Sequence, residues 1–378
     1  MMRRRIKTLA SLIILIATML SAISCSRDYD FGFKDLCFYH PHTAPVEVGI
    51  DWDKFRHIED PTGMTAYVWP EDPEEEAHRF VSHNIKDITL NLEAGLYNAF
   101  VFNQTDAEYA TLKFFDMDDY NKAQVKVAFA KSPWYSTKAP DSKLGTEPEW
   151  LAIGNVNDFE VTEEMVAIAE EEFLAGLPEA NKHAKTRNVT KSQFNIATIT
   201  PVSIIKQVDL YVHLENLVFL RSGLGAIEGM AEGCYISTSQ TTSQTVTHAI
   251  DAWGVEYDID DNGAENLMKG AIKASITTFG LPEGHTGRPE DNILYVRLLL
   301  VDNQTLLEME FPIGNILKDL NSYDGTQKDE NGNVIWPQVH VYWPEPLPEV
   351  EPVGGLGGAF DVGVGDWGDE IITELPLM

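Results

Sequence analysis

Cysteine is scarce in this 378-residue chain, which contains only Cys25, Cys37 and Cys234. Small disulfide-stapled domains need several cysteine pairs, so the chain does not belong to that class. If Cys25 is modified as argued below, Cys37 and Cys234 could form a single disulfide in an oxidising compartment. The stability of the fold must therefore come mainly from a packed core, for which the chain is long enough.

Basic residues are also few, because 28 Lys and Arg stand against 59 Asp and Glu, which gives a net charge of −31. Proteins bind nucleic acid largely by setting Lys and Arg against phosphates. We therefore expect no nucleic-acid partner. A basic patch for membrane surfaces is missing too, so attachment to a membrane would depend on a lipid. We interpret the acidity as a solvated, soluble surface.

Catalytic motifs are missing as well. The sequence contains no Gly-x-Ser-x-Gly elbow, no His-Glu-x-x-His helix and no phosphate-binding glycine loop between a strand and a helix. Carboxylate pairs are inevitable among so many acidic residues, and a glycosidase also needs a fixed separation between the two groups. We predict that the protein is not an enzyme and that it has no cofactor and no bound metal.

The N-terminus carries the one feature that indicates a compartment. A basic cluster within residues 3–7 precedes the apolar run at 9–20, and small residues follow that run. This order is typical of a secretory signal peptide, which we assign to residues 1–24. The apolar run is shorter than the roughly 20 residues that a permanent membrane-spanning helix needs.

Cys25 directly follows the small residues "SAIS" and resembles the cysteine of bacterial lipoproteins that is acylated after signal cleavage. Ala22 stands where that pattern prefers Leu. The alternative is ordinary cleavage nearby, which would leave Cys25 free. Asp28 and Asp30 resemble the acidic export signal of Bacteroidetes surface lipoproteins. We predict a lipid on Cys25, a linker over residues 25–33, and a protein exposed at the cell surface on the outer membrane.

Most of the remaining chain alternates between apolar and polar residues, or runs as short β-branched and aromatic segments between turns. This pattern predicts an all-β fold. A polar, basic stretch near residue 190 divides it, so we expect an N-terminal β-sandwich at 34–190 and a C-terminal β-sandwich at 191–348. A Pro/Gly-rich spacer and a final strand are expected over residues 349–378.

Two local elements are predicted in the first half. The segment after Thr162 has acidic residues in its first turn and the apolar residues Met165, Ile168, Ala169 and Phe173 at helical spacing, and Gly176 would end this helix. The residues from Ile88 to Phe102 alternate on either side of the turn "EAG" and predict a β-hairpin.

Two clusters look like metal sites but fail on geometry. Cys37 lies an odd number of residues from His40 and His42, so in a strand the thiol and the imidazoles face opposite ways. The segment "DIDDNGAENLMK" has the early ligands of a calcium loop, but Lys269 stands where a bidentate Glu is required. We therefore assign neither cluster to a metal.

A sugar-binding role is the alternative function, because the chain has eight tryptophans and an exposed indole can stack on a sugar. Trp134 and Trp253 are the candidates for such a platform. Aromatic residues of a sandwich are more often part of the core.

Several segments together resemble a fimbrillin-like family of Bacteroidetes surface lipoproteins, which includes fimbrial subunits and fimbrial anchors. They are "LCFYHPHTAPVEVGIDW", "LEAGLYNAFVFN", "PEWL", "LENLVFLRSGLGAIEGMAEGCY", "TTFGLPEG", "NILYVRLLLVDN" and "GGLGGAFDVGVGDWGDE". The resemblance spans most of the predicted mature chain.

The resemblance implies two tandem transthyretin-like, Greek-key β-sandwich domains, a lipid anchor and a role in fimbriae or adhesion. In such fimbriae a strand from one subunit completes the sandwich of the next by donor-strand exchange. We therefore expect an anchor or accessory subunit whose partners are fimbrial subunits or other surface proteins, with glycan binding as the alternative.

Overall fold

The computed structural model describes residues 42–55, 61–72, 76–131, 134–135, 143–176, 194–323, 328–330 and 334–353. The signal peptide, the linker with Cys25, Asp28 and Asp30, and the C-terminal strand lie outside the described residues. Within the described part of the chain, helices are few and strands dominate. The predicted all-β fold is confirmed.

The first half of the chain, together with residues 194–203, forms a sandwich of two sheets. Sheet A has the order β10-β1-β4, and sheet B has the order β11-β9-β5-β2-β3. Their strands are β1 (Ala44–Ile50), β2 (Met64–Pro70), β3 (His78–Ser82), β4 (Asp87–Leu92), β5 (Gly95–Asn103), β9 (Ala152–Val161), β10 (Phe194–Ile199) and β11 (Val202–Ser203).

The rest of the second half, together with residues 144–145, forms another pair of sheets. Sheet D has the order β19-β18-β13-β15-β8, and sheet E has the order β16-β17-β12-β20. Their strands are β8 (Leu144–Gly145), β12 (Lys206–Glu215), β13 (Leu220–Ala231), β15 (Thr245–Ile250), β16 (Gly254–Ile259), β17 (Glu265–Thr278), β18 (Ile293–Leu300), β19 (Leu306–Pro312) and β20 (Gln338–Tyr342).

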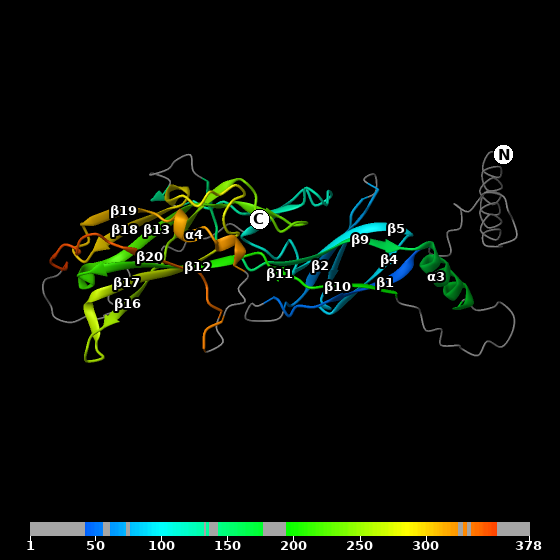
Figure 1. The fold of residues 1–378 in the computed structure, drawn as a ribbon, viewed down its shortest axis with the longest axis horizontal. Coiled ribbons are helices and arrows are strands. Elements are labelled where there is room, and N and C mark those ends of the chain that lie inside the picture. Colours follow the sequence, from blue (N-terminus) through cyan, green and yellow to red (C-terminus); the bar gives the residue numbers. More distant parts are fainter. Residues whose placement is uncertain are drawn as a thin grey trace, which may run out of the picture.

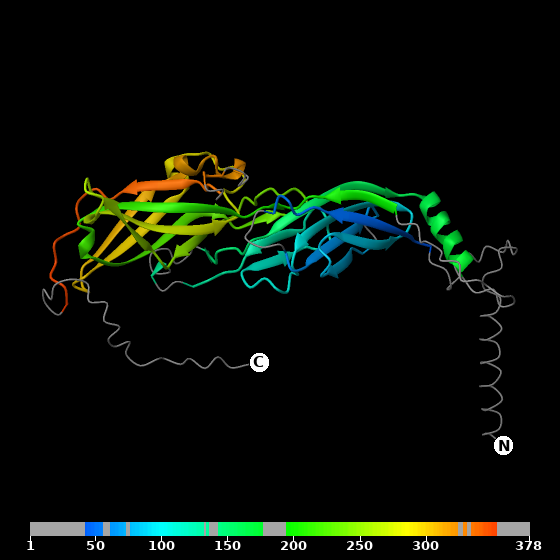
Figure 2. The same ribbon diagram turned by 90° about the horizontal axis from the view of Figure 1, so that it is seen from below.

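Sheet C is a small sheet with the order β14-β7-β6, built from β6 (Leu112–Phe115), β7 (Gln124–Val127) and β14 (Gly233–Tyr235). The helical elements are α3 (Glu163–Gly176), α4 (Gly314–Leu317), η2 (Leu217–Phe219), η3 (Pro289–Asp291) and η4 (Leu320–Ser322). The molecule is elongated, with α3 at one end and the hairpin of β16 and β17 near the other (Figures 1 and 2).

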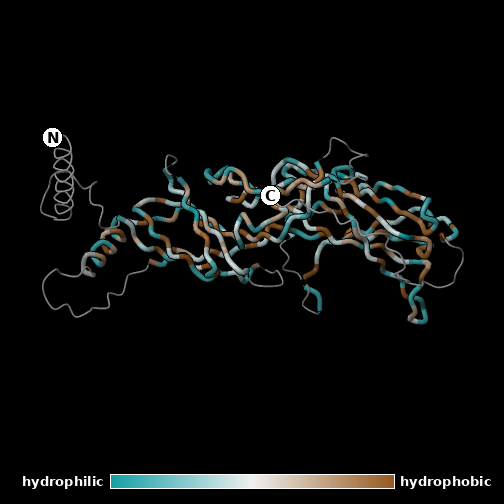
Figure 3. The backbone as a smooth tube through the Cα atoms, turned by 180° about the vertical axis from the view of Figure 1, so that it is seen from behind, coloured by the Kyte–Doolittle hydropathy of each residue, from teal (hydrophilic) through white to brown (hydrophobic). Residues whose placement is uncertain are grey.

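Period-two patterning explains why these segments form sandwiches. Hydropathy alternates along the strands (Figure 3), and β12 and β18 alternate between buried and partly exposed side chains along their length. One apolar cluster joins sheets A and B, with Val46 and Leu90 facing Ala66 and Val101. Each strand thus buries one face against the opposite sheet, as in other β-sandwiches.

Helix α3 confirms the helix expected after Thr162. The Thr162 hydroxyl accepts a hydrogen bond from the Met165 backbone N–H at 3.2 Å, which caps the first turn. Met165 and Ala169 pack against the core of the first sandwich, as does Val166. Phe173, in contrast, is 36% exposed, so the apolar stripe is only partly buried.

The predicted hairpin at Ile88–Phe102 is wrong. Strand β4 pairs with β1 in sheet A, whereas β5 pairs with β2 and β9 in sheet B, and the short turn at 93–94 carries the chain from one sheet to the other. Apolar residues of both strands meet in the core between the sheets. Alternation around a short turn therefore arises at a sandwich corner as well as in a hairpin.

Strand pairing crosses the expected boundary at residues 190/191 in both directions. Strands β10 and β11 follow the boundary but pair with β1 and β9 of the first half. Strands β7 and β8 precede it but pair with β14 and β15 of the second half. The division into two sequence-contiguous domains stays a prediction, and the two halves are interlocked.

Candidate interaction surfaces

Most of the predicted site residues cannot be placed. Cys25, Asp28 and Asp30 lie outside the described residues, as do Cys37 and His40. The lipid anchor and the export signal therefore stay predictions.

Cys234 lies in β14 and is almost completely buried. Burial raises the pKa of its thiol to about 12, and Lys206 acts in the opposite direction. The thiol donates a weak hydrogen bond to the Tyr235 carbonyl oxygen at 3.3 Å. Because the thiolate is the reactive form, Cys234 behaves as a small apolar core residue.

The calcium-like segment forms the turn between β16 and β17. Asp260 Oδ1 accepts hydrogen bonds from the backbone N–H groups of Asn262 and Ala264, each at 2.8 Å. Lys269 forms an ion pair with Glu215 at 2.8 Å. Within the described part of the chain, no three His, Cys, Asp or Glu side chains gather as a metal site.

The prediction of an exposed tryptophan is wrong at residue 134. Trp134 is only 8% exposed, and its indole N–H donates to Glu308 Oε1 at 3.1 Å, so it offers no open face to a sugar. Trp253 is half-buried, and its indole lies so close to Gly225 that a Cβ atom there would come within 2.8 Å of the ring.

A cluster of aromatic rings that the sequence analysis missed lies on the outer face of sheet E. Tyr211 stacks on His340 with ring centroids 4.6 Å apart, and His213 stacks on Tyr342 at 4.5 Å. These are the directly opposite residues of the parallel pair β12 and β20. The alternation of His340 and Tyr342 with buried valines in "QVHVY" is the sequence signal for an outward-facing pair.

The two histidines of this cluster share a hydrogen bond. His340 Nε2 lies 3.3 Å from Gln338 Oε1, which can only accept, so His340 Nδ1 is the acceptor for His213 Nε2–H at 3.0 Å. Burial lowers the pKa of His213, His340 lowers it further, and Asp258 and Glu256 oppose the shift. The two rings therefore present polar edges on the outer face of sheet E.

A cleft of about 460 Å³ lies where the two halves meet. Strand β11, the start of β12, the loop at 239–241 and η4 surround it. Its lining mixes hydroxyl and amide groups with apolar side chains and includes one amine, whose Nζ donates to the Tyr323 carbonyl oxygen at 2.6 Å. The lining residues are Val202, Ser203, Ile204, Lys206, Ser239, Gln240, Thr241, Phe279, Glu283 and Asn321.

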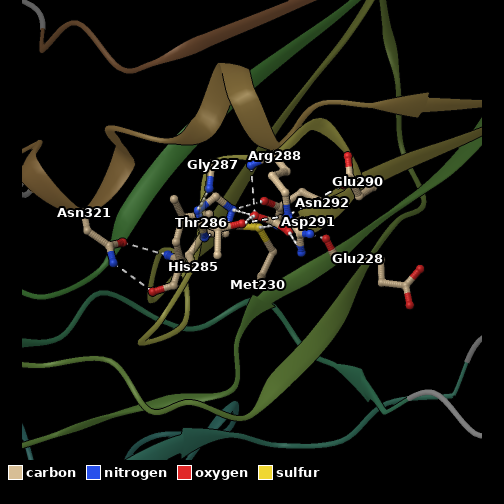
Figure 4. Close-up of polar contacts among 11 residues, drawn as sticks. Glu228, Met230, His285, Thr286, Gly287, Arg288, Glu290, Asp291, Asn292 and Asn321 are labelled. Carbon is tan, nitrogen blue, oxygen red and sulfur yellow. Dashed lines mark hydrogen bonds and ion pairs between the residues drawn. The ribbon is translucent and has the colours of Figure 1, made fainter.

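Next to the cleft, the loop before β18 is fixed by its own polar side chains (Figure 4). Asn321 bonds the Leu281 backbone at both its N–H and its carbonyl, at 2.7 and 2.8 Å. The fully buried Asn292 contacts His285 at 2.8 Å and donates to the Glu228 carbonyl oxygen at 3.1 Å. This loop is preorganised, which lowers the entropic cost of any contact that it makes.

Asp291 holds the centre of the same loop. Its carboxylate accepts hydrogen bonds from the Thr286 hydroxyl and from the backbone N–H groups of Thr286 and Arg288. The Thr286 hydroxyl is the main cause that lowers the pKa of Asp291 to about 2, and the Arg288 charge adds to it. The carboxylate is therefore charged at any physiological pH, and it stabilises the loop rather than acting as an acid.

Several strands are outermost in their sheets and differ in how well their edges are protected. Strand β3 carries His78 and Arg79, β16 carries Glu256 and Asp258, and β19 ends in a proline. Charges and prolines discourage pairing with another chain. Strand β10, with the sequence FNIATI, has neither.

The family profile decides the classification. A profile described as a domain of unknown function, DUF5119, matches residues 24–251, which is more than half of the chain. The chain belongs to the DUF5119 family. No curated protein matches it.

Solved structures similar to this DUF5119 protein come from Bacteroides and Porphyromonas species. A structure described as a candidate adhesin from Bacteroides ovatus is 14% identical, covers 86% of this chain and 98% of its own, and has a TM-score of 0.50. A second candidate adhesin, from Bacteroides thetaiotaomicron, is 11% identical over 79% of this chain and 91% of its own, with a TM-score of 0.46.

The fimbrial anchor protein Mfa2 from Porphyromonas gingivalis is 12% identical over 75% of this chain and 88% of its own, with a TM-score of 0.39. The resemblance noted in the sequence is confirmed at the level of the fold by the first of these structures. All three are named for adhesion or anchoring. No helix among the described residues is long and apolar enough to cross a bilayer.

Proposed function

We propose that this DUF5119 protein is a fimbria-related adhesion protein, tethered to the outer membrane through a lipid on Cys25 and exposed at the cell surface. The observation that carries the proposal is the shared fold with the candidate adhesin from Bacteroides ovatus over 86% of the chain. The protein acts as an anchor or accessory subunit, and its partners are fimbrial subunits or other surface proteins.

Strand complementation is the proposed mode of contact with these partners. An extended segment of a partner can add to the edge of a sheet through main-chain hydrogen bonds, while alternate side chains fill pockets. The edge strand β10, which carries neither a charged residue nor a proline, suits such an addition. The glycan-binding alternative is weaker, because Trp134 is buried and Trp253 is half-buried.

The tether can be tested by replacing Cys25 with Ala in the native host. We expect the variant to leave the outer-membrane fraction, and fimbrial subunits that co-purify with the wild-type protein to be lost from that fraction with it. Ser26→Ala is the matched control, because it changes the next residue without removing the thiol. Retention of Cys25→Ala in the outer membrane would refute the lipid anchor, and a wild-type complex free of fimbrial or surface proteins would refute the assembly role.

A further inference from the structure

His248 is a buried ionisable residue without an evident structural partner. It lies in β15, between Ile227 of β13 and Gly145 of β8, and it is completely inaccessible to solvent. Neither ring nitrogen has a hydrogen-bond partner of good geometry, and only the backbone groups of Gly145 and Thr146 come close enough to favour its charged form. A buried imidazole usually satisfies at least one nitrogen, so this position is costly to maintain.

Apolar groups surround the place where β8 meets His248. A Cβ atom on Gly145 would come within 2.7 Å of side-chain atoms of both Val246 and Val127, so β8 packs tightly against this core. Burial lowers the pKa of His248 to about 4, and the backbone groups of Thr146 and Gly145 act in the opposite direction. The ring is therefore neutral in the folded protein at neutral pH.

The attachment of β8 to sheet D is short. Only Leu144 and Gly145 pair with β15, and the pairing is parallel, which is the weaker arrangement per residue. Backbone hydrogen bonds from Thr247 N to the Lys143 carbonyl, at 2.9 Å, and from Ala130 N to the Leu144 carbonyl, at 2.8 Å, extend it. This small segment covers one side of the buried ring.

Other charged groups around the site do not neutralise a proton on His248. Lys143 pairs with the buried Glu232 at 2.7 Å, and Lys126 approaches the same carboxylate at 3.9 Å, so Glu232 is already shared between two cations. Glu147 binds the Thr277 backbone N–H at 3.3 Å. Its pKa is raised by burial and then by Asp251, so acid protonates Glu147 and removes its charge.

We propose that protonation of His248 releases β8 from sheet D, so that the segment Lys143–Glu147 is an acid-labile clasp between the two interlocked halves. An imidazolium in this buried site has only the backbone groups of Gly145 and Thr146 beside it, and water reaches it once β8 moves away. Opening the segment breaks its two residue pairs with β15, the bridge between Gly145 and Phe129, and the Lys143–Glu232 ion pair. Exposing the ring from the side of β13 would instead disrupt a strand paired along most of its length. Local opening is therefore the easier route.

The direction of the pH effect follows from linkage. The folded-state pKa of His248 is lower than its value in an open segment, about 6.5, so the open form binds more protons. The clasp is fully stable above pH 6.5 and weakens as the pH falls toward 4. Between pH 7 and pH 5 the opening equilibrium should rise about 20-fold.

Hydrogen exchange of the full chain, followed by mass spectrometry, tests the clasp. Labelling times at pH 7 and pH 5 are scaled to the intrinsic exchange rate. We expect peptides covering residues 143–147 and 245–250 to lose protection at pH 5, while peptides of β1 and β4 keep theirs. Equal protection of the clasp peptides at both pH values would overturn the proposal.

His248→Leu tests whether the imidazole is the cause, since the replacement is apolar and of similar volume. In this variant the clasp should stay closed at pH 5. In the control His83→Leu, which removes an exposed histidine, the clasp should open at pH 5 as it does in the wild-type protein. A pH-dependent opening that persists in His248→Leu would contradict the proposal. If that variant does not fold, NMR titration of the wild-type ring decides: a pKa above 6 for His248 rules the mechanism out.

Discussion

At the scale of single residues, Gly229 lies within β13 and packs against the polar loop before β18. Its φ angle is +83°, and a Cβ atom at this position would lie 2.2 Å from the carbonyl oxygen of Asp291. Both the backbone conformation and the contact exclude any larger residue. The same carbonyl belongs to the loop that Asn292 and Asp291 hold in place.

Gly229→Ala should therefore destabilise the protein strongly. We expect a loss of about 2–4 kcal/mol in the free energy of unfolding, because a strained left-handed residue and a backbone clash add together. Gly263→Ala is the matched control, since Gly263 has a similar φ of +79° but nothing within 4 Å of the added methyl group. Gly263→Ala should lower the free energy of unfolding by about 1 kcal/mol. Urea denaturation measures the unfolding free energy of both variants, and equal losses would show that the contact with Asp291 is unimportant.

Residue-level prediction from the sequence succeeded where chemistry is local. The Thr162 cap depends on near neighbours along the chain, and the structure agrees with it. Trp134 was misjudged because Glu308, which accepts the hydrogen bond of its buried indole, is 174 positions away in sequence. The His213 and His340 pair was missed for the same reason, since its members are 127 positions apart.

At the scale of elements, the edge of β10 leads to a second prediction. Ile199 accepts a hydrogen bond from the Asp51 backbone N–H at 2.8 Å, so alternate residues such as Thr198 turn their backbone groups away from β1. The side chains of Asn195 and Thr198 are exposed. If partner strands add at this edge, lysines at these positions should block them.

We expect the double variant Asn195→Lys/Thr198→Lys to fold normally but to lose co-purification with fimbrial or surface proteins. The control is Leu96→Lys/Ser222→Lys, which adds the same charge to exposed positions of β5 and β13, strands paired on both sides. Circular dichroism checks the fold, and affinity purification from native membranes measures the partners. Partners retained by the β10 variant would exclude this edge as the contact.

Strand assignment and strand pairing differ in how far the sequence predicts them. Alternation identified β4 and β5 correctly as strands, because burial of one face is a local property of each segment. It could not distinguish a hairpin from a corner between sheets, because the partner strands β1, β2 and β9 are remote in sequence. The fold class was predictable, and the connectivity was not.

At the scale of the whole molecule, strand pairs join the two halves of the chain across the predicted domain boundary. Four strand pairs cross residue 190: β1 with β10, β9 with β11, β7 with β14, and β8 with β15. The buried pair of Lys143 and Glu232 adds a side-chain link across the same boundary. Each half therefore completes sheets of the other.

Cleavage of the folded protein tests this arrangement directly. A protease site inserted after Arg187, once cut, should leave two fragments that elute together in gel filtration at neutral pH, because the crossing strand pairs persist. They should separate only in denaturant. Fragments that separate without denaturant would show that residues 34–190 and 191–348 are independent domains, as the sequence had suggested. A site inserted after Met2 is the control for the inserted sequence.

The pairing of β1 with β10 also sets an order of events during synthesis. About 150 residues separate the two strands, so β1 is made long before its neighbour. Until then sheet A lacks one of its three strands, and contacts of such long range form slowly. An exposed, incomplete sheet is prone to pair with the wrong chain. The nascent protein is therefore prone to aggregate until Phe194–Ile199 has been made and pairs with β1.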